Sequence, residues 1–383
     1  MAATLIGLGV GLALVRFAHV APGTAVLATM VGMSLGRTQQ HASWPDRATG
    51  LVVVPLVAAG ASALSGLLDG RFAVLGSAVF VLALSATVWL RRFGPRVTKA
   101  GTLAVLPVLS LLFAPAGSPL WTGLATAIVC LLVSGLQVLA GPDAPATPRG
   151  KSSAAASTKM AVQLAAALSA AFVAGRLLWP GHWQWVVLTA FIVCSGNRGR
   201  GDVLHKSALR MAGAGVGTLA ATGLFALVTP SGIGCVVAIL LTLVAGIVLR
   251  PVSYAYWAGC ITAAMALLLG LLGQDATELL FTRLAAIAVG GVLGVAASWL
   301  IVPIHSRDVA RARIGQARRA IESGDSEATR QAIAQLDLIA PAFNAHRRLH
   351  RLLPGSRREK RFVADAFDEI RAEFSRVDHA DSR

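Results

Sequence analysis

The chain alternates apolar runs with short loops that hold most of the basic residues of its first 300 positions. Twelve apolar runs are candidates for helices that enter a bilayer. Several are shorter than the roughly 20 residues that cross a bilayer straight. The first two runs of each half can therefore form a tilted or partly re-entrant pair, with ten spans as the alternative count. The runs lie at about 3–20, 24–37, 50–68, 72–90, 100–115, 120–140, 159–178, 184–196, 209–229, 232–249, 254–273 and 279–302.

The second six runs resemble the first six at a separation of roughly 160 positions, and the matches keep their order along the chain. The order predicts a tandem duplication. Its parts are a first transmembrane repeat at 1–140, a Pro- and Gly-rich linker at 141–158 and a second repeat at 159–303. The matching pairs are 26–31 with 187–193, Arg47–Gly50 with Arg210–Gly213, Leu90–Arg91 with Leu249–Arg250, and Trp121–Ala125 with Phe281–Ala285.

Composition agrees with a polytopic membrane protein and argues against a water-soluble globule. Hydrophobic residues make up 55% of the chain and charged residues 14%, and the mean hydropathy is +0.68. The formal charge of +16 suggests nucleic-acid binding until the charges are located. Residues 305–383 hold 16 of the 34 basic and 12 of the 18 acidic residues, and most of the other basic residues lie in short loops. Membrane topology therefore explains the charge, and we expect no nucleic-acid partner.

Basic residues are distributed unequally between alternate loops. One side holds fourteen of them and the other side four, which places both termini in the cytoplasm by the positive-inside rule. With six spans each, the two repeats insert in the same orientation, so a pathway between parallel repeats is the natural site. The four are Arg16, Arg71, Arg176 and Arg283; the fourteen are Arg37, Arg47, Arg91, Arg92, Arg96, Lys99, Arg149, Lys151, Lys159, Arg198, Arg200, Lys206, Arg210 and Arg250.

Charge within the predicted spans is cationic only, since every Asp and Glu of the membrane part falls in a loop or at a helix end. A buried Arg costs at least ~2.5 kcal/mol unless it snorkels or meets an anion. Arg16, Arg176 and Arg250 lie at span ends, where snorkelling is the stronger reading. Arg210 and Arg283 lie deeper, and we predict that they contact an anionic substrate because a guanidinium matches a carboxylate.

Further pathway residues are predicted around these arginines. Thr189, Trp185 and Tyr254 are candidates to line the path, with Arg250 and Arg176 as additional cations. For Thr189 a helix-packing hydrogen bond is the alternative. Small residues after Arg210, among them Gly213 and Gly217, allow a neighbouring helix to approach closely.

Other chemistry is not indicated. The cysteines Cys130, Cys194, Cys235 and Cys260 lie in apolar runs without CxxC spacing, which is typical of small buried hydrophobic residues. His346 and His350 are four residues apart but surrounded by arginines, so we predict no metal site. No acid, base or nucleophile cluster appears, and we expect neither an enzyme nor a cofactor.

The pattern of residues 304–383 predicts a helical cytoplasmic tail. Helices are expected over about 305–321, from Asp325 onward, and over about 356–377, with apolar residues at helical spacing in the second and third. Such a tail can pack on itself or on a second subunit, which would give a homodimer. Its basic cluster around Arg347–Arg361 can touch anionic lipid headgroups.

Several motifs of the second half form a recognisable set: Trp185–Val193, the basic turn Arg198–Arg200, Arg210–Thr218, Thr282–Ala285, and Gly290, Gly291 and Gly294. With these motifs the second half resembles the fusaric acid resistance (aromatic acid exporter) family of bacterial membrane proteins. The resemblance implies a bacterial inner-membrane permease that exports aromatic or other organic acids. A remoter similarity to plant malate channels points to anion conduction. The chain departs from long family members in having about 17 residues where they carry a soluble insert between the halves.

Together these patterns predict an all-α polytopic bundle of two parallel six-helix repeats with a helical tail. The predicted function is efflux of organic anions, aromatic carboxylic acids above all, through a cationic path. Its partners are then the small anion and the lipid bilayer. Two alternatives stay open: a channel-like anion conductor, and a non-transporting envelope scaffold whose tail recruits partners.

Overall fold

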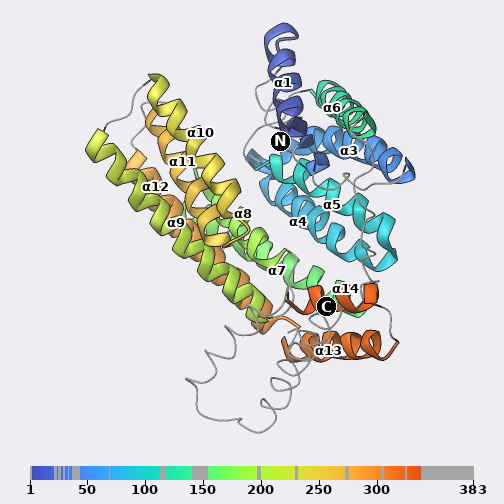
Figure 1. Cartoon of the computed structure of the whole chain (residues 1–383). Coiled ribbons are helices and arrows are strands. Elements are labelled where there is room, and N and C mark those ends of the chain that lie inside the picture. Colours follow the sequence, from blue (N-terminus) through green and yellow to red (C-terminus); the bar gives the residue numbers. More distant parts are fainter. Residues whose placement is uncertain are drawn as a thin grey trace, which may run out of the picture. The chain divides into compact units, whose positions relative to one another are not determined.

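The computed structural model of the chain is helical throughout the part that it describes, and that part contains no β-strand (Figure 1). Helices satisfy every backbone donor and acceptor within one segment, which hydrocarbon surroundings require. The described residues are 2–20, 24, 27–28, 31–32, 34–36, 44–68, 70–112, 118–139, 154–195, 200–228, 232–271, 276–302, 306–323 and 326–337.

The chain forms two compact units, Met1–Val173 and Ala174–Arg383. The boundary falls inside helix α7 (Ala154–Leu178), which begins within the segment predicted as a linker. In the first unit, the Phe172 ring of α7 packs edge-on against Phe80, with 5.5 Å between ring centroids. The predicted repeat boundaries at 140 and 159 stay a prediction.

The described part of the first unit contains five further long helices and three short 3₁₀ turns. Its helices begin several residues before the apolar runs at two places, Trp44 and Pro95, because a helix continues into the polar loop while hydropathy marks only the embedded part. The bounds are α1 (Ala2–Phe17), α3 (Trp44–Leu64), α4 (Ala73–Trp89), α5 (Pro95–Ser110) and α6 (Pro119–Leu139), with turns η1 (Ser65–Leu67), η2 (Gly70–Phe72) and η3 (Leu90–Phe93).

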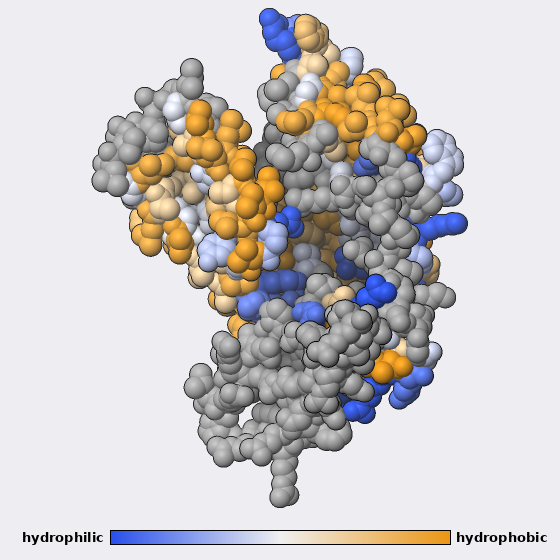
Figure 2. Space-filling model, in the orientation of Figure 1, coloured by the Kyte–Doolittle hydropathy of each residue, from blue (hydrophilic) through white to orange (hydrophobic). Residues whose placement is uncertain are grey.

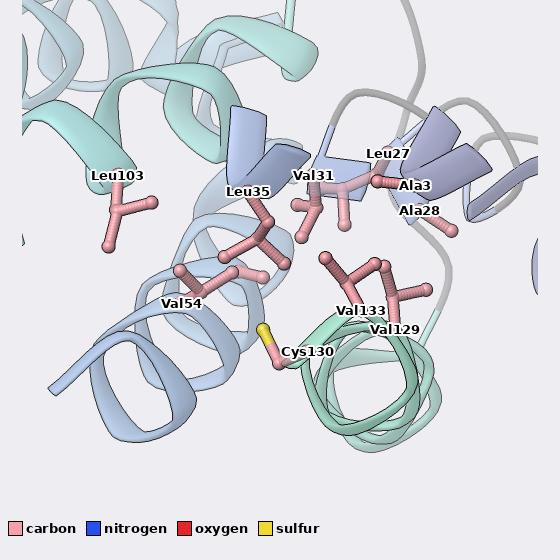
Figure 3. Close-up of a cluster of buried hydrophobic side chains, with 11 residues drawn as sticks. Ala3, Leu27, Ala28, Val31, Leu35, Val54, Leu103, Val129, Cys130 and Val133 are labelled. Carbon is pink, nitrogen blue, oxygen red and sulfur yellow. The ribbon is translucent and has the colours of Figure 1, made fainter. Parts of the chain in front are cut away.

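A buried apolar cluster holds the first unit together (Figure 3). Side chains from α1, α3, α5 and α6 meet there with residues of the predicted second run. Leu35 and Ala28 of that run are fully buried against Val129 and Val133 of α6. Cys130 lies in the same cluster as a small buried side chain, as the sequence predicted.

The membrane part of the second unit, as far as it is described, contains α8 and four long helices. Helix α8 has only 12 residues, about 18 Å, so it is too short to cross a bilayer of about 30 Å straight. The sequence predicted this short second element. The bounds are α8 (Trp183–Cys194), α9 (Arg200–Val228), α10 (Gly232–Leu249), α11 (Tyr254–Leu271) and α12 (Ala276–Leu300).

The same helix pairs pack in both units. Helix α3 contacts α5 and α6 while α4 contacts α5; correspondingly, α9 contacts α11 and α12 while α10 contacts α11. This is the pattern that a duplicated six-helix bundle predicts, and the duplication itself remains a prediction.

The surface of both units is apolar enough for lipid. Five described helices are long and apolar enough to cross a membrane, and three shorter apolar helices accompany them. Large apolar side chains such as Val74, Leu139, Leu219 and Leu300 are more than two-thirds exposed. Figure 2 shows orange, apolar side chains over much of the visible surface of the helices. The chain is therefore a multi-pass membrane protein, while the count of twelve spans stays a prediction.

The tail begins with two packed helices, α13 (Ser306–Glu322) and α14 (Ser326–Asp337). Ile314 and Ala317 of α13 and Ile333 and Leu336 of α14 are buried. The first two predicted tail helices are thus present. The third, and the basic cluster at 347–361, lie outside the described residues.

Candidate anion site

Helix α8 presents two of the predicted lining residues, Trp185 and Thr189, on one face, since residues four apart lie one above the other. Each contacts an arginine from a different helix. Thr189 is 1% exposed and lies toward Arg210 of α9, and the Trp185 ring lies against Arg283 of α12.

Arg210 is held by two hydroxyl groups. Its Nε donates a hydrogen bond to the Thr189 hydroxyl at 3.4 Å, and its Nη1 donates to the Tyr254 hydroxyl at 3.1 Å. Tyr254 is the first residue of α11, so side chains of α8, α9 and α11 converge. Both acceptors are neutral, and the Arg210 charge is oriented without being neutralised.

Arg283 is buried, with 6% of its surface exposed. Its guanidinium carbon lies 4.2 Å from the centroid of the Trp185 ring, a cation–π contact. Its buried Nε and Nη1 have no hydrogen-bond acceptor within the described part of the chain. A buried donor without an acceptor costs about 1–3 kcal/mol, and more when it is charged, so this guanidinium is prepared for an anionic partner.

Glycines of α12 allow this helix to approach α8 closely. A Cβ at Gly290 would lie 2.9 Å from the Cβ of Thr189, and a Cβ at Gly294 would lie 3.1 Å from a methyl group of Val193. Helix α12 therefore runs parallel to α8 at close distance. Because Gly290 sits two turns after Arg283, this contact fixes the height at which the arginine meets Trp185.

The site is electropositive. Arg210 and Arg283 both lie next to α8, Arg210 through Thr189 and Arg283 through Trp185. No carboxylate of the described residues contacts either of them. Asp202 in the first turn of α9 is buried but paired with Lys206, at 2.7 Å between Oδ2 and Nζ. Two guanidinium groups that no described carboxylate contacts are suited to binding a carboxylate.

The two additional predicted cations lie against tryptophans of their own. The Arg176 guanidinium is 4.7 Å from the Trp183 ring centroid, and that of Arg250 is 5.4 Å from the Trp257 ring centroid. The structure thus brings together Arg210, Thr189 and Tyr254, and separately Arg283 and Trp185. The ring of Trp185, predicted to line the path, thus carries the protein's own Arg283.

Sequence reasoning missed the partner of the glycine stripe on α9. Gly213 lies against Ala255 and Ala258 of α11, and Gly217 lies against Gly259. Both contacts advance by four residues, so α9 and α11 run parallel in close contact. The small residues at 255 and 259 have the spacing that favours close helix packing, and this spacing could have revealed the pair.

Comparison with known proteins agrees with the predicted resemblance. No curated protein and no solved structure matches the chain. Residues 152–297 match the model of a family described as fusaric acid resistance protein-like. The matched segment runs from α7 to α12 and includes all seven predicted site residues. The second membrane half of this chain is therefore similar, over residues 152–297, to the family described as fusaric acid resistance protein-like.

Proposed function

We propose that the protein is a permease that exports organic anions, with aromatic carboxylic acids as the preferred class. The observation that carries the proposal is the pair Arg210 and Arg283, two guanidinium groups that no described carboxylate neutralises. The match of residues 152–297 to a fusaric acid resistance protein-like family supports membrane export.

The contacts support separate tasks for the two arginines. Arg210 is oriented by Thr189 and Tyr254, so it offers a fixed positive charge at the junction of three helices. Arg283 has buried donors that no described acceptor satisfies, and a carboxylate oxygen would be a strong acceptor for them. A carboxylate passing this site therefore loses its hydration and gains two cationic contacts.

The remaining features of the proposal concern topology. We place the protein in a bacterial inner membrane with both termini in the cytoplasm, because basic loops favour that side. We also propose that the membrane part consists of two parallel six-helix repeats. The packing of equivalent helix pairs in the two units supports this proposal.

The test is export of a radiolabelled aromatic acid, such as benzoate, from cells that express the protein. Arg210→Ala and Arg283→Ala are each expected to lower the export rate at least tenfold, since a desolvated carboxylate would lose a charged hydrogen bond of about 1.5–3 kcal/mol. Arg71→Ala is the matched control, because Arg71 also lies on an aromatic ring, that of Phe72, but in the first unit.

Equal export by wild type, Arg210→Ala and Arg283→Ala would remove the site assignment. Purified protein in liposomes separates the two transport mechanisms. A steady anion current without a coupling ion would identify a channel, and export dependent on a second ion would identify a carrier. No movement of any organic acid would favour the scaffold alternative.

A further inference from the structure

A narrow groove runs along the outside of the second unit, over the small residues of α11. Helices α9 and α10 form its walls, and its volume is about 350 Å³. Val216 is 66% exposed and Tyr256 is 52% exposed, so the groove opens on the surface of the unit. Gly259 and Ala263 keep its floor low.

The length of the groove fits the hydrocarbon chain of a lipid. Its lining on α9 extends from Ala212 to Leu224, which is about 18 Å along a helix and close to one leaflet of a hydrocarbon core of about 30 Å.

The lining offers little to a polar ligand. No charged side chain is among the described residues that line the groove. The hydroxyl of Thr242, one of its few polar groups, donates to the carbonyl of Ala238 at 2.7 Å and is satisfied within its own helix. A sugar or a carboxylate would lose its hydration here without compensation.

A cation lies where α10 ends, beside the beginning of the groove lining on α11. Arg250 follows α10 directly and lies over the ring of Trp257, three residues into α11. The groove lining on α11 begins in that same first turn, at Ala255 and Tyr256. Tryptophan, tyrosine and arginine are the residues that anchor proteins at the headgroup level of a bilayer. An apolar groove one leaflet long thus begins beside an exposed arginine.

We propose that this groove binds one anionic phospholipid, with an acyl chain along α11 and the headgroup phosphate on Arg250. The charge of Arg250 complements a phosphate, and the groove accommodates the chain that the headgroup carries. Neither Arg210 nor Arg283 is among the residues that line the groove, so the proposal does not depend on the transported substrate.

The test is native mass spectrometry of the full-length protein, purified in a delipidating detergent and given a mixture of phosphatidylglycerol and phosphatidylcholine. Wild type is expected to retain one phosphatidylglycerol. Arg250→Gln removes the phosphate contact, and Ala220→Phe fills the groove from its exposed wall. Each is expected to lower lipid retention at least tenfold. Arg250→Lys keeps the charge and Leu219→Phe adds the same ring outside the groove, so both should retain the lipid.

Three results would overturn the proposal. The first is equal retention by wild type and Arg250→Gln, and the second is equal retention of phosphatidylcholine and phosphatidylglycerol by wild type. The third is a two-chain species that Ala220→Phe converts to one chain, since the groove would then hold a second copy of the protein. If Ala220→Phe does not fold, the comparison of Arg250→Gln with Arg250→Lys decides alone.

Discussion

Arg283 combines two properties that are costly in a membrane protein: it is charged, and it is buried with donors that no described acceptor satisfies. A purely structural arginine would be expected to pair with a carboxylate or with backbone carbonyls. The ring of Trp185 compensates only in part, because a cation–π contact contributes about 0.5–2 kcal/mol. The buried charge of Arg283 is therefore expected to cost stability, as the proposed role in anion binding implies.

Arg283→Met tests this at the scale of one side chain. Methionine has a similar length and removes the buried charge, so we expect unfolding in detergent at an equal or higher temperature than wild type. Replacing buried ions by apolar side chains stabilises proteins by about 1–4 kcal/mol in favourable cases. Tryptophan fluorescence during heating, without added anion, gives the midpoint. A clearly lower midpoint would mean that the arginine stabilises the fold.

At the scale of elements, the second unit depends on parallel helix pairs in close contact. Helix α9 meets α11 through Gly213 and Gly217, and α12 meets α8 through Gly290 and Gly294. The first pair brings Tyr254 to Arg210, and the second brings Arg283 to Trp185. Glycines therefore set the distance between the helices, and that distance determines which polar side chains can meet.

Two neighbouring glycines of α9 give a matched comparison. A Cβ at Gly217 would press on the carbonyl oxygen of Gly259, whereas a Cβ at Gly215 would meet nothing within 4 Å. Gly217→Ala is expected to destabilise by about 1–3 kcal/mol through overpacking. Gly215→Ala should be neutral or stabilising by up to about 1 kcal/mol through helix propensity. Thermal unfolding of both variants measures the difference, and equal midpoints would contradict the close contact.

At the scale of the whole molecule, the loops with most basic residues are expected on one side of the membrane. If the two repeats are parallel, equivalent loops lie on the same side. The loop after α4 corresponds to the loop after α10, and the end of α1 corresponds to the end of α7. Inverted repeats would place the members of each pair on opposite sides.

Single cysteines at four loop positions test this topology. Cysteines replacing His19 and Gly181 are expected to react with a membrane-impermeant maleimide in intact spheroplasts. Cysteines replacing Arg92 and Val252 should react only after the membrane is opened. Background labelling should be low, since Cys130, Cys194 and Cys235 are buried. Opposite labelling of His19 and Gly181 would exclude parallel repeats.

The helical architecture could be predicted from sequence because hydrophobic length is a local property. The apolar run predicted at 232–249 has the same bounds as α10. The run predicted at 184–196 differs from the bounds of α8 by at most two residues at each end. Helix starts were less predictable. Helix α9 begins at Arg200, nine residues before its predicted start, because polar residues extend a helix beyond the hydrocarbon without changing the apolar pattern.

Part of the site was also predictable, because charge in an apolar run is costly wherever it lies. Arg210 and Arg283 could be identified as candidate site residues from the sequence on this ground. Their contacts depend on residues far apart in the chain, such as Tyr254 with Arg210. The groove over α11 is likewise formed by three helices, and no single helix shows it.

The sequence by itself determined that the chain is a multi-pass helical membrane protein with cationic positions in its apolar segments, because the bilayer imposes one local requirement on each residue. The tertiary structure decided which cations share a site: Arg210 with Thr189 and Tyr254, and Arg283 with Trp185. Helix packing in a membrane depends on close shape complementarity between surfaces of nearly uniform apolarity. The hydropathy pattern contains no information on that complementarity, so these contacts became known only from the folded arrangement of the helices.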